Sequence, residues 1–315
     1  AMEENPRVTI VKGEEPAFCL KAVKNPVELA NTKNAHIKEG VAMARLQMCL
    51  EEKLAAGETV SETDVGELLV DFRKEQEGYM EDSFAVIAAY GANAAMMHYH
   101  PTPENHAVLQ RKGFLLLDTG GQYVDGTTDT TRTYALGELT DEERRYYTYV
   151  LKANIGIART VFMEGCSGAN LDIMSRTQIW KYGLDYRCGT GHGVGFVGPI
   201  HEGPQSLRMT NHVPFQPGMT ITDEPGIYEE GLVGVRIENE LLVVEHMETK
   251  YGKFYAFQPI TYLPIDTTPV VLELMNEEEI SWLNDYHQMV YDTLSPRMTE
   301  RERIWLKEKT KPLEK

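Results

Sequence analysis

The order of predicted elements along the chain, two helices followed by strands, constrains the fold more than any single motif. The first helix is predicted to begin after Asn25, which forms a capping box with Glu28, and to end at Gly57. A second helix is predicted from Ser61. Residues 83–133 then change to short apolar runs broken by Gly, Pro and Asn, a pattern typical of strands and hairpins.

The same order recurs in the second half of the sequence. Thr140 and Glu143 form another capping box, and the helix that they open is expected to end at Gly165. A shorter helix is predicted over residues 171–182, and residues 189–245 again have the pattern of strands. This duplication of element order predicts an α+β fold in which two halves pack their sheets around a central cleft.

Segments at both ends lie outside this duplicated unit, which spans residues 21–250. Residues 1–20 contain one strand-like run, RVTIV, and are interpreted as a linker that remains from upstream domains. Residues 251–315 are interpreted as a C-terminal extension that packs on the duplicated unit or contacts a second subunit. This extension contains a strand-like run, a helix capped by Asn276 and a final helix from Thr299.

Two aspartates are predicted to face each other in the first half. Asp118 directly follows three leucines, which is a poor position for a solvated charge, and Asp129 lies among threonines. The two residues are equidistant from the bond between residues 123 and 124, so a tight turn there would make them cross-strand neighbours. Asp125-Gly126 is the better turn signal, and with that turn a bulge would be needed.

Two glutamates have the same arrangement in the second half. Glu224 and Glu238 are symmetric about Gly231, in a predicted hairpin whose loop contains the glycines that a tight turn needs. Between the two hairpins lies GTGHGVGF, in which His192 is flanked by glycines that leave little side-chain bulk around the imidazole. Each of these residues alone has an ordinary structural interpretation, and only the whole set indicates a metal site.

Four carboxylates gathered in one cleft would repel one another. At ~4 Å and an effective dielectric constant of ~20, each pair costs ~4 kcal/mol. Two divalent cations would cancel the four negative charges, and His192 would supply a neutral nitrogen ligand. Oxygen ligands with one imidazole suit Mn²⁺, Co²⁺, Fe²⁺ or Zn²⁺, and they differ from a thiolate zinc site.

Composition narrows the classes of partner and compartment. The formal net charge of -17 and the pI of about 5.0 argue against nucleic acid and against an anionic membrane as partners. No apolar run approaches the ~20 residues that cross a bilayer. The cysteines form no CxxC pair, which is typical of reduced thiols in a cytoplasmic protein; they are Cys19, Cys49, Cys166 and Cys188.

The order and spacing of the five candidate ligands match those of the pita-bread metallopeptidases (family M24): Asp118, Asp129, His192, Glu224 and Glu238. This family includes aminopeptidase P, prolidase, methionine aminopeptidase and creatinase. The chain most resembles the cytosolic, eukaryotic-type branch of aminopeptidase P, the Xaa-Pro aminopeptidases. The resemblance covers nearly the whole chain, from KAVKNPVE through IHEGPQ to WLNDYH. It implies the pita-bread fold, with the duplicated unit as the catalytic domain.

This resemblance also implies a dinuclear site that typically holds Mn²⁺. Asp118 would chelate one ion, while Asp129 and Glu238 would bridge both. His192 and Glu224 would complete the shell of the second ion. A water that bridges the two cations would lose a proton readily and become the nucleophile. Glu224 would be the general base that passes this proton toward the departing amine.

Three further residues are assigned roles through the same resemblance. His98 in MMHYHP and His201 in PIHEGP match the family's two active-site histidines that are not ligands. They would hold the scissile carbonyl and stabilise the tetrahedral intermediate. Arg236 lies two residues before Glu238, and so on the same strand face, where it would orient a ligand carboxylate.

The sequence departs from the family pattern in two ways. Many relatives carry a histidine four residues before the metal-binding one, and here that position is Cys188. This exchange concerns hydrogen bonding to the substrate and leaves the metal chemistry intact. Relatives of this branch also carry two upstream domains that help to wall the cleft, so we expect looser peptide selectivity or lower activity for this chain.

The leading functional hypothesis is a metal-dependent exopeptidase that releases the N-terminal residue from peptides with proline at the second position. A prolidase, which cuts only Xaa-Pro dipeptides, is the alternative with the same chemistry. A non-catalytic peptide-binding module is the alternative from a different class, and retention of all five ligand positions favours an enzyme. A homodimer is compatible with the apolar tail and with the habit of the family.

Overall fold

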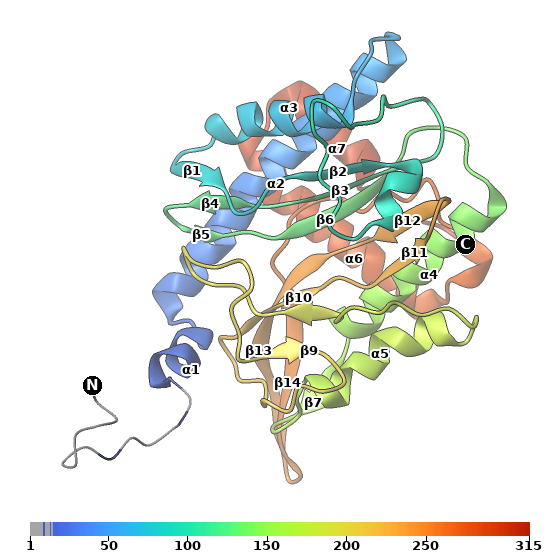
Figure 1. The fold of residues 1–315 in the computed structure, drawn as a ribbon. Helices are drawn as coiled ribbons and strands as arrows, with labels where there is room; N and C mark the ends of the chain where they lie inside the picture. The colour runs from blue at the N-terminus through green and yellow to red at the C-terminus, as the bar shows by residue number, and fades with distance from the viewer. Residues whose placement is uncertain (1–8, 10–12, 14) are drawn as a thin grey trace.

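Capped helices and short antiparallel strands make up the fold. The structure is a computed structural model that describes residues 9, 13 and 15–315. The helices are α1 (Pro16–Ala22), α2 (Pro26–Ala55), α3 (Glu62–Lys74), α4 (Asp141–Ala158), α5 (Gly168–Trp180), α6 (Glu277–Leu294) and α7 (Glu300–Lys309), with the 3₁₀ turns η1 (Gly91–Ala95), η2 (Leu272–Leu274) and η3 (Ser295–Arg297) (Figure 1). The strand predicted at residues 7–11 lies outside the described residues, except for Thr9, which is in no strand.

The strands of the described residues form five small sheets. One sheet has the order β2-β3-β6, a second β1-β4-β5 and a third β10-β13-β14-β7, while β8-β9 and β11-β12 are two-stranded. The strands are β1 (Tyr79–Asp82), β2 (Ile87–Tyr90), β3 (Phe114–Thr119), β4 (Gly121–Tyr123), β5 (Gly126–Thr127), β6 (Thr130–Ala135), β7 (Val161–Met163), β8 (Gly191–His192), β9 (Ser206–Leu207), β10 (Thr220–Asp223), β11 (Gly226–Glu229), β12 (Val233–Arg236), β13 (Asn239–Thr249) and β14 (Gly252–Pro259).

The first two long helices begin at the predicted caps. Asn25 accepts hydrogen bonds from the backbone N–H groups of Val27 and Glu28, and the Glu28 carboxylate accepts one from the Asn25 N–H, which completes the capping box. Ser61 caps α3 in the same way with Asp64. These helices pack on each other, and their apolar faces share one core with β3.

The second pair of helices is confirmed with shifted ends. Thr140 and Glu143 cap α4, but α4 ends at Ala158 rather than at Gly165, so the predicted end was wrong. After α4 the chain forms β7, whose backbone pairs with β14. The helical hydrogen-bond pattern therefore cannot continue to Gly165. α5 starts after Ser167, a few residues earlier than predicted, because Ser167 and Asn170 form an unrecognised capping box.

The predicted register of the aspartate hairpin was wrong. In the β3-β6 pair Asp118 lies opposite Thr131, so Asp118 and Asp129 are not direct cross-strand partners. Between these strands the chain forms the small hairpin β4-β5, in which Tyr123 pairs with Gly126, so the turn lies one residue later than predicted. Asp129 falls in the connection between β5 and β6.

The predicted register of the glutamate hairpin is confirmed. Gly226 pairs with Arg236 in β11-β12, and Asp223 pairs with Asn239 in β10-β13. Both pairs are symmetric about Gly231, and the same symmetry sets Glu224 across from Glu238. Glu224, which directly follows β10, and Glu238, which directly precedes β13, therefore lie side by side.

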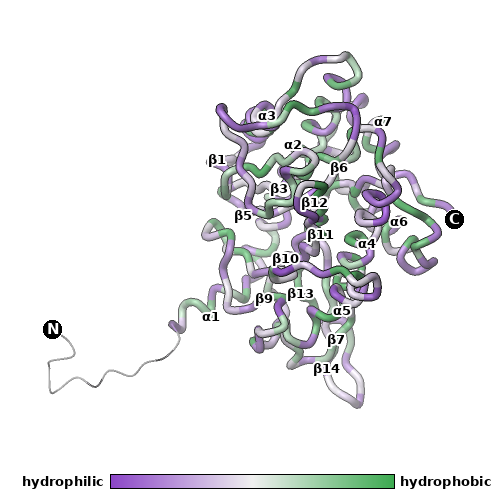
Figure 2. Tube along the Cα trace, turned by 45° about the vertical axis from the view of Figure 1, so that its right-hand side comes forward, coloured by the Kyte–Doolittle hydropathy of each residue, from purple (hydrophilic) through white to green (hydrophobic). Residues whose placement is uncertain are grey.

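The duplicated order of helix, helix and strands is confirmed in space. Figure 2 shows α2, β3 and β6 in one half of the molecule and α5, β13 and β14 in the other. A backbone hydrogen bond from the Glu238 N–H to the Thr131 carbonyl joins the two halves directly. No described helix has the length and apolarity that a membrane-spanning segment requires.

Arg132 ties the C-terminal segment to both halves. Its guanidinium is buried, and one of its N–H groups donates to the backbone carbonyl of Glu238. A buried cation needs such partners, because an unsatisfied charge costs several kcal/mol. The remaining acceptors come from β6, β13, the segment after β14, and α6: the carbonyls of Thr131, Pro264 and Leu263, the Asn239 side chain and the Tyr286 hydroxyl.

His287 on α6 is also buried, which makes it a packing residue. Its Nε2 accepts a hydrogen bond of 3.2 Å from the backbone N–H of Ile265, so the proton of the neutral ring resides on Nδ1. Burial lowers the pKa of His287 to about 4, and the nearby Arg132 contributes to the same shift.

We expect His287 to make the fold sensitive to acid. A histidine in the unfolded chain has a pKa near 6.5, so between about pH 6.5 and 4 the unfolded state binds a proton that the folded state does not. The free energy of unfolding therefore decreases as the pH is lowered through this range, by roughly 2 kcal/mol at pH 5. His287→Gln retains an acceptor and removes this titration. Urea unfolding of the chelated protein at pH 7 and pH 5 should show a smaller loss for the variant.

The exposed His246 gives the matched control. His246→Gln should leave the difference between the two pH values as in the unmodified chain. Equal pH dependence for His287→Gln and the unmodified chain would contradict the assignment.

Candidate metal centre

One cavity collects every residue that the sequence singled out for chemistry. Its volume is about 290 Å³, and it lies where the two halves meet. The first half contributes residues from β3, from the segment before β6 and from the loop after η1. The second half contributes residues from β8, from β12 and from the ends of β10 and β13. The predicted residues that line it are His98, Asp118, Asp129, His192, His201, Glu224, Arg236 and Glu238.

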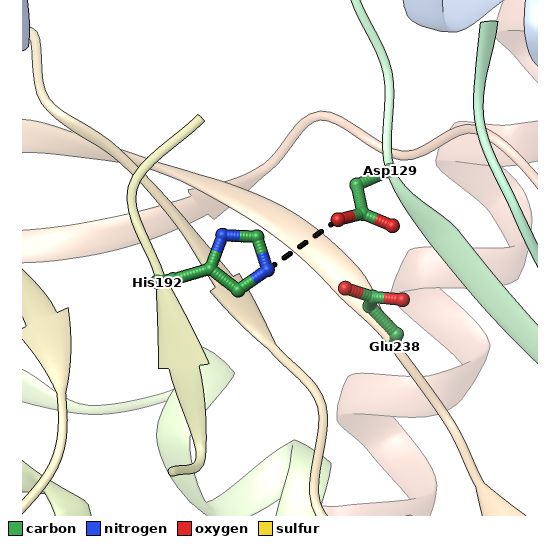
Figure 3. A group of neighbouring side chains, drawn as sticks. All are labelled: Asp129, His192 and Glu238. Carbon is green, nitrogen blue, oxygen red and sulfur yellow. Dashed lines mark ion pairs between the residues drawn. The ribbon is translucent and has the colours of Figure 1, made fainter. Parts of the chain in front are cut away.

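Three of the predicted ligands form a compact cluster. One ligand atom from each of Asp129, His192 and Glu238 lies within 4.8 Å of the others (Figure 3). The Nε2 atom of His192 is 3.4 Å from Asp129 Oδ2 and also 3.4 Å from Glu224 Oε1. These separations are suitable for atoms that share a bound cation.

The backbone around His192 sets the orientation of its ring. Its Nδ1 lies 3.0 Å from the carbonyl oxygen of Gly193, and donation to that oxygen leaves the lone pair of Nε2 facing the carboxylates. The Cβ atom of any residue other than glycine at position 191 would lie 1.8 Å from the Thr222 carbonyl oxygen. Glycine is therefore required for β8 to lie this close to β10.

Arg236 connects Asp118 to the same cluster. Its Nη2 donates to Asp118 Oδ2 at 2.5 Å, and its Nη1 donates to the Tyr228 hydroxyl at 2.8 Å. The second Asp118 oxygen is buried and has no hydrogen-bond partner among the described residues. One oxygen of Asp118 is thus held by arginine, and the other is free to coordinate a cation.

Two threonines position the glutamates, and the sequence analysis did not single them out. Thr131 donates to Glu238 Oε2 at 2.7 Å and accepts a hydrogen bond from Arg236 Nε. Thr222 donates to Glu224 Oε1 at 3.1 Å. Strand alternation could have identified both, since Thr131 lies two residues after Asp129 and Thr222 two residues before Glu224.

The electrostatics of the site favour occupation by cations. Burial raises the pKa of Asp129, Glu224 and Glu238, and repulsion from the neighbouring carboxylates adds to the shift. Bound divalent cations would reverse this effect, because they replace like-charge repulsion by attraction. Buried oxygens, one free imidazole nitrogen and an unpartnered oxygen of Asp118 make a donor set that fits two such ions.

The two other predicted histidines line the same cavity. The ring of His201 contacts that of His192, with the ring centroids 3.9 Å apart. Partial burial lowers the pKa of His201 to about 4, and the neighbouring His192 contributes to the shift. His201 is therefore a neutral hydrogen-bonding group at neutral pH. His98 is exposed and lines the same cavity.

Much of the remaining cavity wall is apolar, although His100 and Tyr228 also line it. Cys188 lies there, and burial raises the pKa of its thiol to about 11, so the side chain is an uncharged surface at neutral pH. The other apolar side chains come from both halves: Phe84, Ile87, Met97 and Ile200. The cavity thus combines a polar cluster at one end with a wall that suits a nonpolar ligand group.

The profile of metallopeptidase family M24 matches residues 30–245, and the profile of the C-terminal region of that family matches residues 253–313. The chain belongs to metallopeptidase family M24. Two curated relatives of this M24 chain are similar over most of its length. Aminopeptidase P2 of Arabidopsis thaliana is 42% identical over 96% of the chain and 43% of the relative. A probable Xaa-Pro aminopeptidase P of Coprinopsis cinerea is 40% identical over 95% of the chain and 49% of the relative.

Solved structures give the same family and its pita-bread fold. The X-prolyl aminopeptidase of Caenorhabditis elegans, described as a cytosolic enzyme with a di-nuclear active site, has a TM-score of 0.91 and 35% identity, covering 95% of this chain and 50% of that one. The prolidase of Pyrococcus furiosus has a TM-score of 0.63 and 26% identity, covering 78% and 66%. The M24 chain thus spans about half the length of the curated relatives that it matches.

We expect Glu238→Gln to separate metal binding from folding. The amide retains an oxygen that accepts from Thr131 but removes one charge from the crowded site, so the chelated variant should melt at or above the temperature of the unmodified chain. Added Mn²⁺ should raise the melting temperature of the unmodified chain, because a ligand stabilises the state that binds it. The variant should gain much less.

The control is Glu248→Gln, which changes an exposed glutamate on β13. It should respond to Mn²⁺ as the unmodified chain does. A Glu238→Gln variant with the full response to Mn²⁺ would refute the ligand role of Glu238.

Proposed function

We propose that this M24 chain hydrolyses the N-terminal residue from peptides that have proline at the second position. The observation that carries this proposal is one cavity in which the carboxylate and imidazole cluster adjoins His98, His201 and an apolar wall. Relatives named aminopeptidase P and Xaa-Pro aminopeptidase support the same choice of substrate.

Five residues are proposed to hold two divalent cations: Asp118, Asp129, His192, Glu224 and Glu238. The description of the C. elegans neighbour as di-nuclear supports the number of ions, and we propose Mn²⁺ as the metal, with Co²⁺, Fe²⁺ and Zn²⁺ as alternatives. When bound, such a pair of ions polarises water for attack on a peptide carbonyl and stabilises the charge that develops. Arg236 would fix Asp118 for this role through the contact of its Nη2.

Glu224 is proposed as the group that moves protons. Its carboxylate retains some exposure to the cavity, and Thr222 holds one of its oxygens. A proton taken from the attacking water could therefore be held at Glu224 and delivered to the departing amine. His98 and His201 would donate hydrogen bonds to the scissile carbonyl, which a neutral ring can do through one N–H.

Selectivity for proline is proposed to reside in the apolar wall. A tertiary Xaa-Pro amide has no N–H to offer, so the ring must be recognised by shape and apolar contact. Cys188 lies at this wall as a neutral thiol, smaller than the histidine that we expect at this position in many relatives. We propose that the smaller side chain leaves more room beside the substrate and removes one hydrogen bond to it.

The proposal also covers the cellular location, the domain organisation, the oligomeric state and the partners of the protein. We propose a cytoplasmic location, which the description of the C. elegans neighbour as cytosolic supports. We further propose that residues 21–250 form the catalytic domain, that residues 251–315 pack on it, and that the chain can form a homodimer. The net charge of -17 supports peptides, rather than nucleic acid, as its partners.

A panel of three peptides tests the activity. With Mn²⁺ present, an Xaa-Pro-Xaa tripeptide should be cleaved. An Xaa-Ala-Xaa tripeptide should resist cleavage, because alanine is too small to make the apolar contacts that the proline ring makes with the cavity wall. Chelation should abolish the reaction. An Xaa-Pro dipeptide cleaved in preference to the tripeptide would favour a prolidase, and equal cleavage of all three peptides would refute selectivity for proline.

Asp129→Ala provides the inactive control for this panel. It should lose activity and metal while its far-ultraviolet circular dichroism stays as in the unmodified chain. An unmodified chain that binds no metal and cleaves none of the peptides would favour the peptide-binding module instead.

We expect His201→Ala to lower kcat by about 10²- to 10³-fold, the usual cost of removing one donor to a developing oxyanion. Bound metal should remain at two ions per chain, because His201 is proposed to contact substrate and not metal. The exposed His212 is the control, and His212→Ala should be fully active. A His201→Ala variant that loses metal would instead make His201 a support of the ligand shell.

A further inference from the structure

A second cavity lies on the opposite face of the strand that carries Asp118. It is about 140 Å³ in volume and is lined by residues of α2, β3 and β6 and by the chain near them. Leu115 and Tyr134 are cross-strand partners that line it. Because side chains alternate along a strand, Leu115 faces away from the side to which Asp118 points. The sheet therefore separates this cavity from the metal centre.

Two buried polar atoms at this cavity lack partners. The hydroxyl of Tyr134, a residue with 4% exposure, has no hydrogen-bond partner among the described residues. The same holds for the side-chain carbonyl oxygen of Gln47, a residue with 7% exposure. Buried polar groups without partners cost about 1–3 kcal/mol each, so two at one cavity indicate a group that satisfies them.

The chemistry of these two atoms specifies the group. Burial raises the pKa of Tyr134, so its hydroxyl retains the proton and can donate. The Gln47 amide nitrogen already donates to Glu51, and only the carbonyl oxygen of Gln47 is available, as an acceptor. A single ligand hydroxyl can accept from Tyr134 and donate to Gln47.

The remaining walls specify the body and the far end of the ligand. Leu50, Leu54 and Leu115 are buried and line the cavity, and a cavity of about 150 Å³ with such a lining holds a benzene ring. Arg111 is exposed at the edge, and its side chain forms no hydrogen bond or ion pair with the described residues. The other charged residue that lines the cavity, Glu51, forms an ion pair with Lys309. Arg111 is therefore the charged group available to a ligand at this cavity.

We propose that this cavity is a second small-molecule site, which binds a hydroxyphenyl carboxylate. The ring would lie between the leucines, the phenolic hydroxyl would bond Tyr134 and Gln47, and the carboxylate would reach Arg111 at the edge. This site is independent of the peptide chemistry at the metal centre, because its residues are on the other face of the sheet.

Three probes separate the contributions: 4-hydroxyphenylacetate, phenylacetate without the hydroxyl, and p-cresol without the carboxylate. Ligand-observed NMR on the metal-loaded chain should give the lowest Kd for 4-hydroxyphenylacetate. Removing the hydroxyl should weaken binding by about fivefold or more, the usual value of one hydrogen bond. Tyr134→Phe should reduce this preference, because only the hydrogen bond to Gln47 would remain, and Arg111→Gln should remove the preference for the carboxylate over p-cresol.

Tyr251→Phe, at an exposed tyrosine on the surface, is the matched control and should bind all three probes as the unmodified chain does. Carboxylates that bind only at the metal centre would be unaffected by Tyr134→Phe, and that result would overturn the proposal. The proposal would also be overturned by the absence of saturable binding, which would leave a hydrated cavity. Neither result would bear on peptide hydrolysis, which is measured separately.

Discussion

Repulsion among buried carboxylates is the constraint around which this fold is built. Asp129, Glu224 and Glu238 are brought into one cavity, where burial and mutual repulsion oppose their ionisation. The chain balances part of this cost with Arg236 and Thr131, which hold the carboxylates of Asp118 and Glu238. The electrostatic imbalance that remains favours divalent cations, so the proposed metal binding follows from the way the carboxylates are packed.

Local signals in the sequence predicted much of this arrangement. The caps at Asn25, Ser61 and Thr140 lie where the pattern indicated, because a cap depends on residues three positions apart. The symmetry about Gly231 also held, since a tight hairpin fixes its own register. The symmetry between Asp118 and Asp129 failed because the chain leaves the sheet between them, and local sequence does not encode such an excursion.

Contacts between distant segments were beyond the sequence pattern. Thr131 and Thr222 could have been found by strand alternation, but the hydrogen bond from Thr131 to Glu238 depends on how the two halves dock. The second cavity could not have been predicted, because it arises where Gln47 on α2 meets Tyr134 on β6 and the Gln47 carbonyl oxygen and the Tyr134 hydroxyl find no partner among the described residues. One strand, β3, thus contributes to two sites of opposite character, a charged one on one face and a largely apolar one on the other.

The buried guanidinium of Arg132 connects the C-terminal segment to the backbone of the metal centre. Its N–H groups bond the carbonyl of Glu238 and, at the same time, the carbonyls of Leu263 and Pro264. Residues after β14 therefore act as an anchor for the backbone of a proposed ligand. A deletion, insertion or substitution that loosens this anchor would also loosen the backbone at Glu238, about 25 residues upstream, and so the proposed coordination of the ions. In protein engineering, the segment after β14 and the candidate metal centre would therefore have to be kept together.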